Sequence, residues 1–259
     1  MNRRAAVAVV TGGASGIGAA CCRELVRRGY KVAIADVDAV TAGRIASEIG
    51  GAAFSVDVGE EASVEDLAER VEHALGPVDV LVNSAGVMQT PRSPETLQLS
   101  SWDHVVRIDQ RGTYVACLAF GRRMAARGYG AIVNIASIAG MRSMPLHSYA
   151  PAKAAVISMT ECLAAEWGRS GVRVNAVSPG YTRTPALQAA IAQGKRDVSA
   201  LENNSALGRL VEPEEIAIAV AFLAGGDAGA ITGVNLPVDA GWLVATSWQT
   251  YKGLPDKRK

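Results

Sequence analysis

Short apolar runs recur along the whole chain and are separated by longer stretches of mixed polarity. The runs are rich in Val, Ile and Ala, and seven of them stand out: Ala6–Thr11, Lys31–Asp36, Ala52–Val58, Val78–Asn83, Gly130–Ser137, Val172–Pro179 and Gly233–Asp239. Near-continuous apolar runs of this length are typical of strands that are buried on both faces. The pattern therefore predicts seven buried strands.

Helical patterns fill the stretches between these runs. The clearest are Ala19–Arg28, Val64–Leu75, Trp102–Arg127, Tyr149–Ser170 and Pro213–Ala224. A strand that alternates with a helix from one end of a chain to the other is typical of a parallel sheet whose crossover helices cover both faces. We predict an α/β fold, a doubly wound (Rossmann) parallel sheet of about seven strands with helices on both faces.

Composition supports one ordinary globular domain. The 259 residues are 49% hydrophobic and carry 26 basic against 25 acidic side chains, a balance that does not favour a nucleic-acid partner. No linker, charge block or repeat divides the chain, so residues 1–250 are interpreted as one domain, and 251–259 as a basic tail. The first apolar run is cut by Gly12 before a signal peptide could form, and no run is long enough to span a membrane. We expect a cytoplasmic protein with no membrane partner.

Cysteine and histidine are too dispersed to indicate a metal site. The four cysteines show no C-x-x-C spacing, and the three histidines lie far apart: Cys21, Cys22, Cys117 and Cys162, with His73, His104 and His147. Reduced and mostly buried thiols, with no metal, are the expectation.

A glycine-rich stretch, "AVAVVTGGASGIG", follows the first run. It fits neither G-x-G-x-x-G nor a P-loop, and instead reads Thr11-Gly12-x-x-x-Gly16-x-Gly18 between a strand and a helix. Glycines allow close approach of a pyrophosphate, and the next helix offers free N–H groups at the positive end of its dipole. The stretch is either a dinucleotide loop or a tight turn without a ligand.

Asp36 ends the second run. A dinucleotide fold places a carboxylate there to bind the adenosine ribose hydroxyls, and a carboxylate repels a 2′-phosphate. The neighbouring Ser15 and Val37 offer no positive charge, so NAD is favoured over NADP. The alternative is that Asp36 caps the next helix.

Ser137 ends the fifth run, and Tyr149 and Lys153 follow in "YAPAK". A spacing of four places the phenol and the ammonium on one face of a helix, one turn apart. The cation stabilises phenolate and so lowers the pKa of the phenol, which suits a general acid or base. A tyrosine and a lysine on a solvated helix are the alternative.

Taken together, these motifs resemble the short-chain dehydrogenase/reductase family. "TGGASGIG" resembles its cofactor loop, "NSAG" its N-N-A-G motif, and Ser137 with "YAPAK" its active site. "SPGYTRT" and "ITGVNLPVDAGW" resemble its P-G segment and last strand, so the similarity covers essentially the whole chain.

The resemblance implies a site for a nicotinamide dinucleotide along the carboxyl edge of the sheet. The glycine loop would seat the pyrophosphate, Asp57 and Val58 would contact the adenine, and Tyr149 and Lys153 would bind the nicotinamide ribose. The cofactor-binding residues expected in this way are Gly12, Ser15, Gly16, Ile17, Gly18, Asp36, Asp57, Val58, Asn83, Ala85, Gly86, Tyr149, Lys153, Pro179, Gly180, Thr182 and Thr184.

Three positions depart from the family pattern. Ser84 replaces the second Asn of N-N-A-G, and the interval from Ser137 to Tyr149 is one residue shorter than in many relatives. Asp109 stands where the family has an Asn that holds a water connected to the active-site lysine. A carboxylate there is expected to raise the pKa of Tyr149 and to stabilise the Lys153 ammonium, unless it is protonated or paired with Arg107 or Arg111.

The sequence thus predicts an NAD-dependent alcohol dehydrogenase or ketoreductase that interconverts a secondary alcohol and a ketone. The catalytic residues would be Tyr149 as general acid/base with Ser137, Lys153 and Asp109, and the substrate a polyol or sugar. Alternatives are a 3-oxoacyl-type reductase that uses NADPH and a non-catalytic NAD(H)-binding sensor. The pocket would include Met144, His147, Tyr181 and Leu187, with Met141 beside them; each could equally serve in packing.

Family resemblance also implies a homotetramer joined through the two long helices and the last strand. The end of the chain carries the large aromatic residues Trp242, Trp248 and Tyr251. They are expected to pack on a neighbouring subunit, and the alternative is a tail folded on its own subunit.

Overall fold

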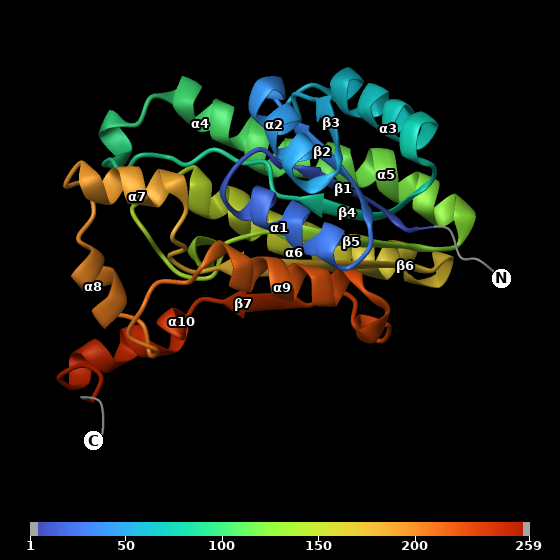
Figure 1. Cartoon of the computed structure of the whole chain (residues 1–259). Coiled ribbons are helices and arrows are strands. Elements are labelled where there is room, and N and C mark those ends of the chain that lie inside the picture. Colours follow the sequence, from blue (N-terminus) through green and yellow to red (C-terminus); the bar gives the residue numbers. More distant parts are fainter. Residues whose placement is uncertain (1–4, 256–259) are drawn as a thin grey trace.

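In the computed structural model, which describes residues 5–255, a parallel sheet lies between two layers of helices (Figure 1). All seven predicted strands are present, and each lies within the run that predicted it. They are β1 (Val7–Thr11), β2 (Lys31–Asp36), β3 (Ala52–Ser55), β4 (Val78–Asn83), β5 (Gly130–Ile135), β6 (Val172–Pro179) and β7 (Asn235–Val238). The predicted fold class is therefore confirmed.

Helices connect the strands and extend beyond them at one end. Their bounds are α1 (Gly16–Arg27), α2 (Ala39–Ile49), α3 (Glu61–Leu75), α4 (Leu99–Val105), α5 (Thr113–Arg127), α6 (Tyr149–Trp167), α7 (Pro185–Ala192), α8 (Val198–Asn203), α9 (Pro213–Ala224) and α10 (Trp242–Ala245). The bounds predicted for α9 are confirmed, and α6 continues as a 3₁₀ turn to Ser170 as predicted. The helices α2, α7, α8 and α10 were not predicted.

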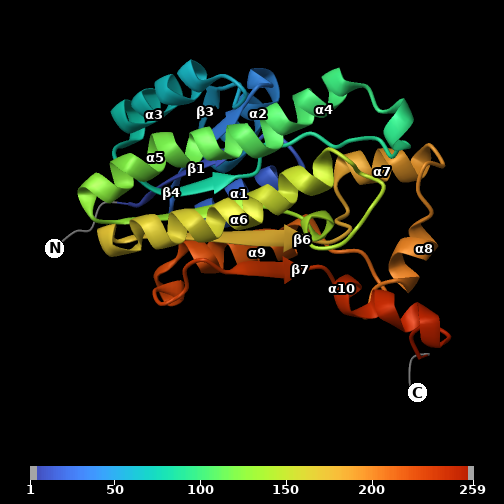
Figure 2. The same cartoon turned by 180° about the vertical axis from the view of Figure 1, so that it is seen from behind.

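Alternate residues of the strands supply two separate cores. Ala8 and Val10 of β1 pack with α1, α2 and α9, whereas Val7 and Val9 pack on the opposite face with α3, α5 and α6. Figures 1 and 2 show these two helix layers from opposite sides. Burial on both faces explains why the strands are apolar throughout and do not alternate with polar residues.

The strand order is β3-β2-β1-β4-β5-β6-β7. The chain adds β2 and β3 on one side of β1 and β4 to β7 on the other side, so the order of addition reverses between β1 and β4, although all strands are parallel. Chain connections leave this point toward opposite faces, so the loops at the carboxyl ends diverge and a crevice opens between them. In Figure 2 the strand arrows point toward α7, α8 and α10, which lie beyond the carboxyl ends. Every sequence motif that follows a strand is therefore gathered at this edge.

The prediction of one continuous helix from Trp102 to Arg127 is wrong. Helix α4 begins at Leu99, and a π-helical segment, Val106–Gly112, separates it from α5. Within this segment a Cβ at Gly112 would lie 2.9 Å from the carbonyl oxygen of Val58, so the backbone packs directly on the segment after β3. The wider turn changes the direction of the side chains and turns Asp109 into the interior, where it is fully buried.

Cys21, Cys22 and Cys117 are buried and Cys162 is exposed, so the expectation of mostly buried free thiols is confirmed. No helix within residues 5–255 is long and apolar enough to cross a membrane. Trp242 contacts Tyr181 of its own chain, whereas Trp248 and Tyr251 are exposed, and the expected packing of these aromatic residues on a neighbouring subunit stays a prediction. The charged end, residues 256–259, lies outside the described residues.

Candidate active site

The glycine loop after β1 is packed so tightly that two positions require glycine. Gly12 has a φ of 68°, and a Cβ there would lie 2.6 Å from the backbone nitrogen of Ala85. A Cβ at Gly18 would collide with the carbonyl oxygen of Gly12. Ser15, the N-cap of α1, makes no side-chain capping bond, so its side chain leaves the first N–H groups of the helix available to a ligand.

Asp36 lies beside this loop and does not cap a helix. Its Oδ2 accepts a hydrogen bond from the Ala14 N–H (3.0 Å) and its Oδ1 accepts one from the Asp38 N–H (3.0 Å). Asp38 caps α2 by accepting from the Thr41 N–H at 3.0 Å. The alternative role of Asp36 as a helix cap is therefore wrong. Its carboxylate lies next to the glycine loop, to which it is hydrogen-bonded at Ala14.

Asp57 and Val58 follow β3 on the same edge. Oδ1 of Asp57 accepts from the Gly59 N–H at 2.8 Å, its Oδ2 lies 3.6 Å from Arg107, and Val58 is buried. The Asp57 carboxylate is half-exposed, and its Oδ1 is held in place by the backbone N–H of Gly59 in the same loop. This arrangement is compatible with the adenine contact that the family resemblance implies.

Asn83 ends β4, but its side chain faces the interior. Its Nδ2 donates to Oδ1 of Asn134 on β5 at 2.9 Å, and Asn134 in turn donates to Oγ1 of Thr160 on α6 at 2.9 Å. All three side chains are buried. This network joins β4, β5 and α6, so the wall of the crevice near the N-S-A-G turn is formed by the residues that follow Asn83.

Ser137, Tyr149 and Lys153 come together as predicted. Lys153 Nζ lies 5.5 Å from the centre of the Tyr149 ring and donates to the carbonyl oxygen of Ile135 at 3.0 Å. The Ser137 side chain is close enough to the phenol to lower the pKa of Tyr149. Because Lys153 is only 4% exposed, its charge acts on the phenol with little screening by solvent.

Asp109 is the partner of this lysine. Its Oδ2 lies 3.2 Å from Lys153 Nζ, and its Oδ1 accepts from the Val87 N–H at 2.8 Å. Arg107 instead contacts Glu60, and Arg111 bonds the carbonyl oxygen of Gly59 and also contacts Glu61. The alternative pairing of Asp109 with either arginine is therefore wrong.

The buried charges shift both titrating groups in the same direction. Burial, the largest effect, raises the pKa of Tyr149, and the charge of Asp109 raises it further. Lys153 and Ser137 lower this pKa by less, so the pKa of Tyr149 is raised overall. Burial lowers the pKa of Lys153, but Asp109 and Tyr149 raise it further than burial lowers it. Lys153 lowers the pKa of Tyr149 as expected, but burial and Asp109 outweigh it, so the expectation of a depressed pKa is corrected to a raised one. Asp109 raises this pKa, in the direction expected.

The segment after β6 returns to the glycine loop. Gly180 packs on β7, since its N–H donates to the Val238 carbonyl at 2.9 Å, and Thr182 pairs with Val211. Thr184 caps α7 by accepting from the Leu187 N–H, and its Cγ2 lies 3.4 Å from where a Cβ at Gly16 would be. The Pro179–Thr184 segment therefore lies next to the glycine loop at Gly16, whereas the N-S-A-G turn packs against that loop at Gly12.

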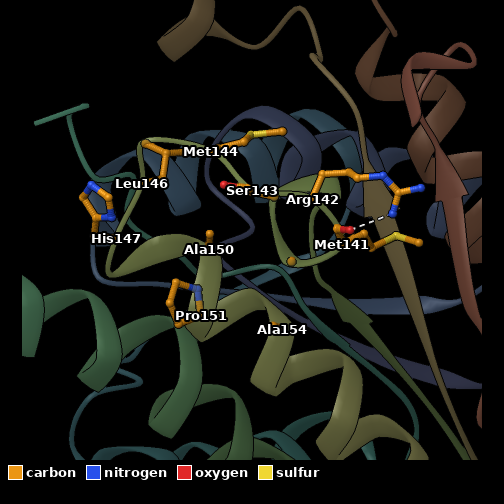
Figure 3. Close-up of a pocket in the computed structure, with 11 residues that line it drawn as sticks. Met141, Arg142, Ser143, Met144, Leu146, His147, Ala150, Pro151 and Ala154 are labelled. Atoms are coloured by element: carbon orange, nitrogen blue, oxygen red, sulfur yellow. Dashed lines mark hydrogen bonds between the residues drawn. The ribbon is translucent and has the colours of Figure 1, made fainter. Parts of the chain in front are cut away.

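The four residues expected to line the substrate pocket do not share one cavity. Met144 and His147 line a cavity of about 430 Å³ between the loop after Ser137 and the start of α6, together with Met141 (Figure 3). This cavity faces Ala150 and Ala154, which are turned by about 100° around the helix from Tyr149 and Lys153. Tyr181 instead packs on Trp242, and Leu187 lies on α7.

One residue that the sequence analysis missed contacts the start of α6. Gln89, after β4, accepts with Oε1 from the Ser148 N–H (2.7 Å), the Ser148 hydroxyl (2.9 Å) and the Tyr149 N–H (3.5 Å). Ser148, the N-cap residue, makes no capping bond with its own side chain. Gln89 thus caps the helix that carries Tyr149. Nothing in the local sequence of Gln89, which follows the end of β4 at Asn83, indicates this contact.

The crevice fits a nicotinamide dinucleotide. Two of its glycines leave no room for a Cβ, the N–H groups of the first turn of α1 are not capped by Ser15, and a carboxylate stands at the end of β2. These are the features by which a doubly wound sheet holds a pyrophosphate and a ribose. A phenol and an ammonium lie further along the same edge. Fold and site together define a dinucleotide-dependent oxidoreductase.

Comparison with known proteins places the chain in a family. The family model described as Enoyl-(Acyl carrier protein) reductase matches residues 12–243. D-threitol dehydrogenase of Mycolicibacterium smegmatis is 40% identical over 92% of this chain and 93% of its own length. Galactitol 2-dehydrogenase (L-tagatose-forming) of Cereibacter sphaeroides is 38% identical over 92% of this chain and 95% of its own length. The chain belongs to the short-chain dehydrogenase/reductase family, as an alcohol dehydrogenase of that family.

A solved structure is more similar still. The protein from Brucella melitensis 16M described as ribose-5-phosphate isomerase is 55% identical to this chain and superposes on it with a TM-score of 0.96. The match covers 98% of each of the two chains. Its described activity differs from that of the two dehydrogenases, since an isomerase catalyses no net oxidation. The family and the fold are shared; the substrate is a separate question.

Proposed function

We propose that this protein is an NAD-dependent dehydrogenase that interconverts a secondary alcohol of a polyol or sugar with the corresponding ketone. The observation that carries the proposal is the arrangement of Ser137, Tyr149 and Lys153 on the edge of the sheet that also holds the glycine loop. A bound nicotinamide would supply hydride acceptance. The protein supplies position and proton transfer.

Tyr149 is the proton acceptor in this proposal. Its phenolate takes the proton of the substrate hydroxyl, and Ser137 donates a hydrogen bond to the same substrate oxygen. Lys153 stabilises the phenolate, since its ammonium faces the ring and is held by Asp109 and the carbonyl oxygen of Ile135. Ketone reduction reverses these transfers, with the Tyr149 phenol as the acid.

Asp36 supports NAD as the preferred cofactor. Its carboxylate adjoins the glycine loop, where it can accept bonds from the ribose hydroxyls and repel a 2′-phosphate. The same charge argues against the 3-oxoacyl-type reductase with NADPH. The complete Ser-Tyr-Lys set argues against a non-catalytic sensor.

The names of the relatives support the substrate class. Two dehydrogenases that are about two fifths identical to this chain are named for threitol and galactitol, which are both polyols. The structure described as ribose-5-phosphate isomerase supports a second candidate, an aldose–ketose isomerase. An isomerase needs no net change of a dinucleotide, so the two candidates are separable by assay.

Assembly as a homotetramer is part of the proposal, and a cytoplasmic location stays a prediction. Exposed apolar side chains lie on α5 (Tyr114, 44%, and Leu118, 36%) and on α9 (Ile218, 51%, and Phe222, 38%). Strand β7 is an edge of the sheet. These surfaces suit contacts between copies of the chain.

The test uses purified full-length protein with NAD or NADP and a panel of threitol, galactitol, sorbitol, simple secondary alcohols and ribose 5-phosphate. Formation of reduced cofactor with a polyol and NAD is the expected result. Conversion of ribose 5-phosphate to a ketose without any change in the cofactor would establish the isomerase instead. Preference for NADP would overturn the role given to Asp36.

A further inference from the structure

A second cavity, of about 500 Å³, opens next to the start of α6. It lies between the segment after β4 and helix α4, and Gln89 and Val105 are the two buried residues in its lining. The other residues that line it are Val87, Met88, Thr90, Arg92, Thr96, Leu97, Gln98, Ser100, Ser101 and His104. We call this cavity the Gln89 groove.

Gln89, which lines this groove, has an unused hydrogen-bond donor. The orientation of its amide is fixed, because three donors of Ser148 and Tyr149 face one of its two terminal atoms, and only the oxygen can accept from them. Nε2 therefore points elsewhere. It is buried, and no acceptor within residues 5–255 bonds it.

A buried donor without a partner is costly. Native proteins seldom leave such a group unbonded, since it has lost its water and gained nothing in return. Nε2 is itself buried and Gln89 as a whole is only 5% exposed, so bulk solvent does not reach this donor; the residue lines a cavity large enough for a ligand. An acceptor atom of a molecule in the Gln89 groove would satisfy it.

The charges of the lining residues indicate which chemical class of molecule the groove would bind. Arg92 contributes a guanidinium, His104 an imidazole, and the remaining polar lining residues are hydroxyls and amides. No aspartate or glutamate is among the lining residues. A groove with donors, a cation and no carboxylate suits an oxyanion better than a neutral hydroxyl, because charge-assisted bonds to an anion are the stronger.

We propose that the Gln89 groove binds an oxyanion at the far end of the substrate, so that the enzyme prefers an alcohol that carries a carboxylate or a phosphate. The inference rests on the proposed function, and it refines the substrate class. Gln89 connects the two parts of the site: Oε1 holds the backbone of Tyr149, while Nε2 donates to the anionic end. It is thus a specificity-determining residue that also positions α6.

The test compares three substrates with one carbon skeleton: sorbitol, sorbitol 6-phosphate and gluconate. The wild type is expected to have a kcat/KM at least about tenfold higher for one of the charged compounds than for sorbitol, the factor that one charge-assisted hydrogen bond supplies. Whichever charged compound shows the preference identifies the phosphate or the carboxylate as the natural end group.

Two variants separate recognition from helix capping. Gln89→Glu keeps an acceptor for the N–H groups of Ser148 and Tyr149 but replaces the donor with a negative charge, and Arg92→Gln removes the cation without touching α6. Each is expected to bring the ratio of kcat/KM between charged and neutral substrates close to one. Arg169→Gln, the same charge change at an exposed site in the 3₁₀ turn after α6, is the control and should keep the ratio.

Several outcomes would overturn the inference. One is a wild type that shows no preference for a charged compound, and another is a ratio of kcat/KM between charged and neutral substrates that is unchanged in both variants. A third is that Gln89→Glu loses turnover of all three substrates to the same extent, which would leave Gln89 only its capping role. If other alcohols reduce NAD but none of these three does, the proposed function stands and the inference fails. If nothing reduces NAD, the proposed function fails, and the inference is then decided by thermal denaturation: sorbitol 6-phosphate or gluconate should stabilise the wild type and not Gln89→Glu.

Discussion

Replacing Asp109 with Asn should move the pH profile of alcohol oxidation to lower pH. Oxidation needs the phenolate of Tyr149, and the pKa of that phenol is raised by burial and by Asp109. The raised pKa means that kcat/KM rises only on the alkaline side of neutrality in the wild type. Asn carries no charge, so the Lys153 ammonium is no longer offset and favours phenolate more strongly.

The magnitude follows from two distances. Asp109 Oδ2 lies 3.2 Å from Lys153 Nζ, which lies 5.5 Å from the centre of the phenol ring, so the carboxylate is within about 9 Å of that centre. At about 8 Å and an effective dielectric constant of about 20, two unit charges interact by about 2 kcal/mol. Since one pKa unit corresponds to about 1.4 kcal/mol, the midpoint should fall by about one and a half units.

The assay is the initial rate of NAD reduction with a polyol from the panel, measured from about pH 7 to about pH 11. Asp103→Asn serves as the control, because it removes the same charge from the exposed surface of α4 and should leave the midpoint in place. Circular dichroism at each pH shows that both variants stay folded. A midpoint that is unchanged or higher in Asp109→Asn refutes the reasoning.

Three other changes test the cofactor site, the chemistry and the core. Tyr149→Phe should lower kcat by about 10²- to 10⁴-fold and leave NADH binding, followed by fluorescence, largely intact; retained turnover contradicts the mechanism. Asp36→Ala should reduce the preference for NAD over NADP by at least about tenfold, and an unchanged ratio of the two kcat/KM values contradicts its role. Phe120→Ala, at a fully buried site in α5, should cost about 3–5 kcal/mol of unfolding free energy, against less than about 0.5 kcal/mol for Tyr129→Ala at an exposed site.

The strands could be predicted because their environment is uniform. Each is buried on both faces, so a run such as Val78–Asn83 is apolar without interruption and stands out from the mixed pattern of the helices. The short helices α7 and α8 have no fully buried residue, so neither carries the apolar stripe that predicts a helix. Only their caps, Thr184 and Asp197, indicate where they begin.

Residues at the ends of the strands could also be predicted, because a parallel sheet brings all carboxyl ends to one edge. Contacts between loops could not. Asp109 was expected near the lysine only through the family pattern, and its alternatives remained open until the π-helical segment was seen to direct it at Lys153 and away from Arg107 and Arg111. Gln89 was missed because nothing in its local sequence shows that it reaches the first turn of α6.

The choice of Asp at position 109 also has a consequence for charge across the whole site. Both carboxylate oxygens face donors, the Val87 N–H and the Lys153 ammonium, and an Asn could accept from only one of them without turning its own N–H₂ toward the other. With Tyr149 protonated, the charges of Lys153 and Asp109 cancel, whereas a neutral residue at 109 would leave a net positive site. Attraction for an anionic substrate therefore has to come from outside this group, and Arg92 in the Gln89 groove is a cation in position to supply it.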